Sequence, residues 1–201
     1  VQRLLGEPIE LEMEEITEIP ESRIEMAPPE VLKPRLPDHP FFTKEERPYP
    51  RERDGFTKDA GQDIATVRKV MYTLAQQRAA GAGKLAGKTS FTEFAGRTPF
   101  LHGPVYVLPP DPRREYELIV LGDLHGCYSC LKAALLQTDF FGKVQAHLDD
   151  PAKAPDTRLV LLGDYIDRGR YSFDGVLRMA MRLFVTAPGA VYFLRGNHEY
   201  Y

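Results

Sequence analysis

Residues 117–126 read ELIVLGDLHG, and the same plan returns in RLVLLGDYIDRG at 158–169 and in AVYFLRGNHE at 190–199. Each stretch opens with a short apolar run that is typical of a buried strand, and each run leads to a glycine and then to polar residues. Helices are predicted between the runs, over 128–137 and from about 172. Strands that alternate with helices indicate an α/β fold with a mainly parallel sheet. Right-handed crossovers then bring the three strand ends to one edge.

The bulk composition excludes several classes of protein. The 201 residues carry a net charge of −3, and they contain no apolar run of the roughly 18 residues that a membrane-spanning helix requires. A negative net charge argues against a nucleic-acid partner, because proteins that bind the phosphate backbone are usually basic. The first residues show no secretory signal. These observations predict a cytoplasmic protein with no nucleic-acid partner and no membrane association.

Residues 1–58 differ in composition from the rest of the chain. Nine of the seventeen prolines fall in this stretch, and its first thirty residues contain nine glutamates and two arginines. Proline removes backbone donors and interrupts helices and strands, so the stretch is predicted to be a Pro-rich, acidic, extended arm. Two interpretations stay open, a solvated linker and a segment that binds a protein partner.

Residues 59–114 are predicted to be a helix-and-loop extension. The helix covers 59–80, and its apolar face is expected to contain Ile64, Val67, Val70, Met71 and Leu74. A loop is predicted over 81–104, followed by a short strand at 105–108.

Cys127 and Cys130 form a CxxC pair directly after the first polar loop. One pair supplies too few ligands for structural zinc, which takes four, and two thiols cannot make a disulfide framework. We therefore interpret both cysteines as small apolar residues at the start of a helix. A redox or zinc-binding role is the alternative.

The polar residues after the three strands are of the types that bind divalent metals. Carboxylate, imidazole and amide groups are suitable ligands for Mn²⁺, Fe and Zn²⁺. Each glycine allows a sharp turn and a close approach of the backbone to a ligand. A single Asp-x-His after a strand is usually only a polar cap, whereas three loops built on one plan favour a metal site over a structural interpretation.

The three motifs also resemble a known family. GDLHG at 122–126, GDYIDRG at 163–169 and GNHE at 196–199 are similar, in family order, to the signatures of the phosphoprotein-phosphatase branch of the calcineurin-like metallophosphoesterases. The resemblance covers residues 115–201, and 139–157 reads as a long loop inserted between the first two motifs. It implies the N-terminal portion of a metallophosphoesterase α/β sandwich, preceded by the arm and the helical extension.

The resemblance implies a site with two divalent metal ions, with manganese expected first and iron or zinc as alternatives. Asp123 and His125 would hold the first ion, and Asp164 would bridge both ions. Asn197 would bind the second ion and contact the substrate phosphate.

The same resemblance implies three further roles. His198 would be the general acid that protonates the leaving group, and Asp167 would keep it protonated and oriented. Arg168 would bind the phosphoryl group, for which a bidentate guanidinium is suited. A metal-bridging hydroxide would attack phosphorus directly, without a phosphoenzyme.

The leading hypothesis is a protein serine/threonine phosphatase, with a phosphoprotein or a phosphorylated small molecule as substrate. A nucleotidyl pyrophosphatase of the diadenosine-tetraphosphate type is the alternative among enzymes, and a non-catalytic scaffold or regulatory fragment is the alternative of another class. The family pattern continues beyond its third motif with two further histidine ligands and an arginine. We therefore expect this chain to be the N-terminal part of a longer enzyme and to be inactive alone.

Overall fold

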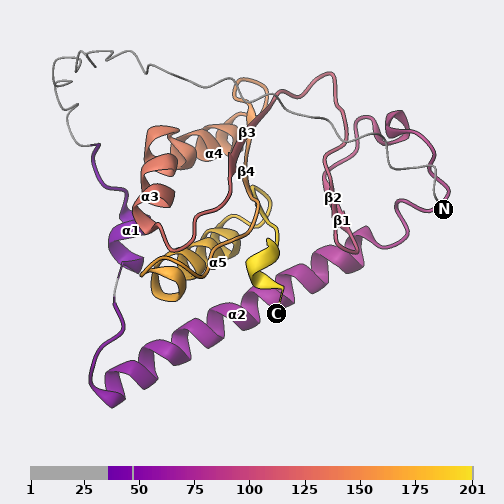
Figure 1. Cartoon of the computed structure of the whole chain (residues 1–201). Helices are drawn as coiled ribbons and strands as arrows, with labels where there is room; N and C mark the ends of the chain where they lie inside the picture. The colour runs from indigo at the N-terminus through magenta and orange to yellow at the C-terminus, as the bar shows by residue number, and fades with distance from the viewer. Residues whose placement is uncertain (1–35, 47, 201) are drawn as a thin grey trace, which may run out of the picture. The chain divides into compact units, whose positions relative to one another are not determined.

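The computed structural model describes residues 36–46 and 48–200, and Figure 1 shows their arrangement. In chain order the elements are α1 (Pro40–Glu45), α2 (Arg53–Gly81), η1 (Phe91–Phe94), β1 (Phe100–His102), β2 (Val105–Val107), β3 (Tyr116–Leu121), α3 (Tyr128–Gln137), α4 (Phe140–Asp149), β4 (Asp156–Leu161), η2 (Ser172–Leu177), α5 (Arg178–Thr186), β5 (Val191–Phe193) and η3 (Asn197–Glu199). None of the helices in these ranges has the length and apolar character needed to cross a membrane.

The centre of the fold is a parallel sheet of three strands in the order β3-β4-β5. Its buried face meets the helices, and this core includes Ile119, Leu131, Leu135, Phe140, Leu159, Leu161, Leu183, Phe184 and Val191. Leu118 and Val120 alternate with Ile119 along β3 and are exposed, so the helices cover one face of this strand. The predicted α/β fold is confirmed, and the three strands end at the same edge.

The crossover from β3 to β4 contains a helix in the segment 139–157. The prediction of a long loop over this segment is therefore wrong. Asp139, with a φ of 50°, separates α3 from a second helix, α4, whose first residue Phe140 is buried. Apolar residues at 140, 144 and 148 repeat at helical spacing, but the glycine and aspartates among them favoured a loop. Packing of α4 against β4 decided the structure of this segment.

Two helices begin inside the stretch that was predicted to be irregular up to residue 58. In α1, Pro40 stands at the first position, where its missing N–H would have no partner within the helix. The ring of His39 caps this helix by accepting a hydrogen bond from the backbone of Phe41 at 3.2 Å. The predicted irregular structure is therefore wrong at α1 and from residue 53, and residues 1–35 of the arm lie outside the described residues.

The helix predicted over 59–80 is confirmed as α2, but most of its predicted apolar face is wrong. Ile64, Val67 and Met71 are exposed, whereas Val70 is buried and Leu74 packs against the core. The inner face instead repeats at helical spacing through partly polar residues, namely Asp59, Asp63, Thr66, Val70, Leu74, Gln77 and Gly81. Polar partners on the facing elements make this possible, and the hydrophobic pattern of α2 alone does not reveal them.

A small antiparallel pair, β1 and β2, lies against the C-terminal end of α2 (Figure 1). A Cβ atom at Gly81 would lie 1.9 Å from the carbonyl oxygen of Leu101, so only glycine permits this approach. Phe94, Phe100 and Val107 form a second, small apolar cluster. The strand predicted at 105–108 is confirmed as β2, while the loop predicted over 81–104 contains η1 and β1.

Candidate metal centre

The loops that follow the three strands have an unusual backbone. Left-handed φ values occur at Asp123 (51°), His125 (40°), Asp164 (54°), Asp167 (65°) and Arg168 (59°). In the described part of the chain, Asp139 is the only other residue besides glycine with a positive φ. Such conformations cost about 1–3 kcal/mol each and persist where the surrounding structure enforces them, typically at functional sites. Five of them in two adjacent loops therefore indicate a site rather than ordinary turns.

The second and third loops approach each other through glycine. A Cβ atom at Gly163, whose φ is 106°, would lie 1.9 Å from the backbone nitrogen of Gly196. A Cβ atom at Gly196 would in turn lie 2.2 Å from Oδ1 of Asp164. No other residue type fits at either position without moving the backbone, so both glycines set the distance between the loops.

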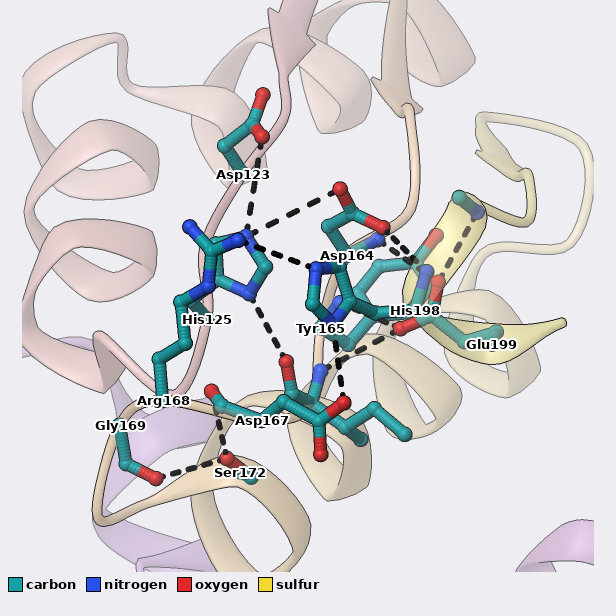
Figure 2. Close-up of polar contacts among 12 residues, drawn as sticks. Asp123, His125, Asp164, Tyr165, Asp167, Arg168, Gly169, Ser172, His198 and Glu199 are labelled. Carbon is teal, nitrogen blue, oxygen red and sulfur yellow. Dashed lines mark hydrogen bonds and ion pairs between the residues drawn. The ribbon is translucent and has the colours of Figure 1, made fainter. Parts of the chain in front are cut away.

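Figure 2 shows the cluster that results, in which His125 faces Asp164 and His198. One ligand atom from each of these three residues lies within 4.8 Å of the others. His125 Nδ1 donates to the carbonyl oxygen of Ile166 at 3.0 Å, because a carbonyl can only accept. Nε2 is then the unprotonated atom of the neutral ring, and it lies 3.8 Å from Asp123 and 3.9 Å from Asp164. A metal-binding histidine is commonly oriented by such a bond.

His198 is held from two sides. Its Nδ1 lies 3.0 Å from Oδ2 of Asp167, and its Nε2 lies 3.4 Å from Nη2 of Arg168. The backbone N–H of His198 donates to Oδ1 of Asp164 at 3.0 Å, which joins this residue to the second loop. A carboxylate can only accept, so the contact with Asp167 places a proton on Nδ1 of His198.

Glu199 ties the second and third loops together. Its Oε2 accepts from the backbone nitrogens of Asp164 at 2.8 Å and Gly196 at 3.0 Å. Its Oε1 accepts from Tyr165 at 2.7 Å and from Ile166 at 3.4 Å. One carboxylate thus accepts hydrogen bonds from four backbone donors that would otherwise lack partners, and it supports both loops.

Tyr165 is an anchor of the site that the sequence did not reveal. It is buried, and its hydroxyl lies 2.6 Å from the carbonyl oxygen of Leu194 and 3.1 Å from that of Leu161. Burial raises the pKa of this hydroxyl above its usual value, and the charge of Glu199 adds to the effect. The position of a tyrosine next to a metal-type aspartate in the sequence does not indicate that its hydroxyl anchors the site. Only the tertiary fold brings its hydrogen-bond partners close.

The structure brings together most of the residues that were predicted for the site. Asp123 reaches His125, although its side chain is 85% exposed. Asn197 lies in η3 next to His198, but the hydrogen bonds found among the described residues involve its backbone oxygen and not its side chain. The geometric cluster instead includes His198, which the sequence assigned to proton transfer.

The donor set fits a divalent cation. Two imidazoles and the carboxylates of Asp123 and Asp164 meet at one edge, and no thiolate takes part. Nitrogen and oxygen donors suit manganese, iron and zinc. Asp123, His125 and Asp164 would hold such an ion, and His198 lies close enough either to bind it or to act beside it.

The two cysteines next to the first loop are bonded to each other. The disulfide joins Cys127, directly before α3, to Cys130 in its first turn. Our interpretation of both as separate small apolar residues was therefore wrong, because it took account of zinc and of a disulfide framework but not of a bond within one helical turn.

Comparison with known proteins identifies a family for the segment that carries these loops. Residues 116–201 match the family described as calcineurin-like phosphoesterase. This segment is part of a calcineurin-like phosphoesterase domain. The family implies divalent metal ions, which agrees with the donor set of the three loops.

Relatives of this phosphoesterase segment include two serine/threonine phosphatases. It is 34% identical over 85 residues to serine/threonine-protein phosphatase PP1-delta of Caenorhabditis elegans, a match that covers 42% of this chain and 23% of that protein. It is 34% identical over 80 residues to serine/threonine-protein phosphatase PP2A-like PPG1 of Saccharomyces cerevisiae, covering 40% of this chain and 18% of that protein. The matches thus span less than a quarter of either relative, and they support the phosphoprotein-phosphatase branch.

Proposed function

We propose that the protein containing this chain is a metal-dependent protein serine/threonine phosphatase. The observation that carries the proposal is that His198 lies beside the candidate metal ligands His125 and Asp164 at the ends of parallel strands, with one polar side-chain atom of each within 4.8 Å of the others. The similarity of residues 116–201 to serine/threonine phosphatases supports a phosphoprotein as the substrate.

The residues around the cluster would divide the work of hydrolysis. Arg168 binds the phosphoryl oxygens, which draws its guanidinium away from His198 Nε2, and that atom then takes up a proton from solvent. His198 then gives the proton to the leaving alkoxide, while Asp167 stabilises the charged imidazole from its other side. Asp123, His125 and Asp164 would hold the metal ions, and Asn197 would complete the predicted ligand set.

We propose two ions, with manganese expected first and iron or zinc as alternatives. Two divalent ions in such a site lower the pKa of a water molecule and offset the charge of the phosphoryl group. All other steps rest on this chain's own side chains.

Substrate class is tested by assaying the full-length protein with a phosphoserine peptide and with diadenosine tetraphosphate, each with added Mn²⁺. Turnover of the peptide is expected. Turnover of the nucleotide alone would replace the proposal with a nucleotidyl pyrophosphatase. Absence of turnover on both substrates, with less than one metal ion bound per chain, would favour the scaffold instead.

The role of His198 is tested with a matched pair of variants. His198→Ala is expected to lower turnover by about 10²- to 10⁴-fold while metal content stays near that of the wild type, because the proposal makes it an acid and not a ligand. His125→Ala is expected to lose both metal and turnover. If both variants lose metal equally, His198 is a ligand and its assignment as the general acid fails.

Several predictions from the sequence stay predictions. They are the cytoplasmic location, the lack of nucleic-acid and membrane partners, the inactivity of this chain alone, and the division into 1–58, 59–114 and 115–201. A protein partner for the arm is a further proposal, and most of that arm lies outside the described residues.

A further inference from the structure

A second cavity lies at the opposite end of the sheet from the metal centre. It has a volume of about 430 Å³ and is bounded by α2, β1 and β2 on one side and by residues of β4 and β5 on the other. Its wall includes Arg158 near the start of β4 and Pro188, which precedes β5, whereas the metal-type loops follow the strand ends. The volume falls in the range of about 300–1,000 Å³ that is usual for small-molecule sites.

The wall of this cavity contains polar atoms that lack partners. Among the described residues, the neutral buried side-chain atoms without a hydrogen-bond partner are Gln77 Oε1, Tyr106 O–H and Tyr192 O–H, and all three residues line the cavity. The two other such atoms are Nε atoms of arginines whose side chains form ion pairs. An unsatisfied buried polar group costs about 1–3 kcal/mol, so three around one cavity indicate a missing partner.

One of these three atoms is an acceptor, and the other two are hydroxyls that can donate. Gln77 Nε2 donates to the carbonyl oxygen of Pro188 at 2.9 Å, which leaves Oε1 as an acceptor. The rings of Tyr106 and Tyr192 lie 4.8 Å apart, and Tyr192 is only 6% exposed. Burial raises the pKa of Tyr106 to about 12, so this phenol is a donor at neutral pH. A ligand would therefore present acceptors to the two phenols and a donor to the glutamine.

The charges around the cavity favour an anion. Lys84, Arg114 and Arg158 all line it. Both arginines pair with the buried carboxylate of Asp156, at 3.1 Å and 2.6 Å, so they carry about one uncompensated charge between them. Lys84 lies 5.1 Å from the centre of the Phe100 ring and forms no ion pair with a described residue. Lys84 and the two arginines thus leave about two positive charges in the wall, which suits an anionic group such as a carboxylate.

We propose that this cavity binds a small organic carboxylate whose remaining part carries a hydrogen-bond donor. The carboxylate lies toward Lys84 and Arg158 and accepts from the phenols of Tyr106 and Tyr192. The donor of the ligand pairs with Gln77 Oε1. Gln77, Lys84 and Tyr106 come from residues outside the matched phosphoesterase segment, so the site belongs to this chain's extension as much as to the phosphoesterase fold.

The test is calorimetric titration of the full-length protein with 4-hydroxybenzoate, which has both the carboxylate and a donor. The titration is made after metal removal, so that carboxylate binding at the metal centre does not contribute. Saturable binding with one molecule per chain is expected, and benzoate, which lacks the donor, should bind several-fold more weakly. Tyr192→Phe should weaken binding about 3- to 10-fold and Lys84→Gln about tenfold, as one neutral and one charged hydrogen bond would give.

Controls separate loss of the site from loss of the fold. Tyr192→Phe removes only an unpartnered hydroxyl, so its melting temperature without ligand should equal or exceed that of the wild type. Lys153→Gln changes an exposed lysine away from the cavity and should leave binding unchanged. The proposal is overturned if 4-hydroxybenzoate does not bind below about 10 mM. It is equally overturned if binding survives both cavity variants, or if a structure of the full-length protein shows its own residues filling the cavity. None of these outcomes depends on phosphatase turnover.

Discussion

Replacement of Glu199 by glutamine should loosen the metal centre without changing the size of the side chain. The carboxylate accepts four backbone hydrogen bonds, two at each oxygen. An amide keeps one accepting oxygen and turns an NH₂ group toward the other two backbone donors. Hydrogen bonds to a charged group contribute about 1.5–3 kcal/mol each, so the loss of two gives about 3–6 kcal/mol. Because Glu199 is only partly buried, we expect the lower end, about 3 kcal/mol.

Urea denaturation of the full-length protein measures this loss as a shift of the midpoint with an unchanged slope. Metal affinity should also fall by about tenfold, since contacts that orient ligand loops typically have effects of that size. Glu117→Gln is the matched control, because this carboxylate on β3 bonds Lys143 and Thr157 at the surface and should contribute less than about 1 kcal/mol. If Glu199→Gln unfolds within about 0.5 kcal/mol of the wild type, the inference that one carboxylate joins the two loops is refuted.

Three further predictions test the contacts that support the site and the binding of metal to it. Asp63→Ala should lower the free energy of unfolding by about 3 kcal/mol at pH 7, because it removes a carboxylate that accepts hydrogen bonds from Nε and Nη2 of the buried Arg178. Burial opposes ionisation of Asp63, but hydrogen bonds from Arg178 and Tyr49 outweigh it and lower its pKa. This stabilisation is therefore present above about pH 4 and is lost as the pH falls through the folded-state pKa, so denaturation curves of wild type and variant should converge in acid. Gly163→Ala should cost more than about 2 kcal/mol and lower metal content, whereas Gly189→Ala, whose Cβ atom meets nothing within 4 Å, should be neutral in the same denaturation assay. Chelation should abolish turnover and lower the melting temperature, both restored by Mn²⁺, because metal binds only the folded site; an unchanged melting temperature would contradict the proposed site.

The sequence alone determined the sheet and the loops that carry the candidate site. Short apolar runs before GDLHG, GDYIDRG and GNHE are strands in the structure, and α3 and the helical segment that begins at Ser172 lie close to where periodicity predicted them. The candidate site followed from the same runs, because parallel strands joined by right-handed crossovers must end at one edge. These features depend on local patterns and on one general rule of topology.

The tertiary structure alone decided the remaining features. α2 presents a partly polar face to the core because Arg178 pairs with Asp63 and the carbonyl of Pro188 accepts from Gln77, and both partners lie more than a hundred residues further along the chain. α4 is a helix because it packs against β4. The bonds from Glu199 to the second loop and the cavity beside Tyr192 likewise join distant segments. The periodicity of a sequence shows which positions of a helix or strand are apolar. The partner that forms a hydrogen bond with a buried polar group is fixed only when the chain has folded.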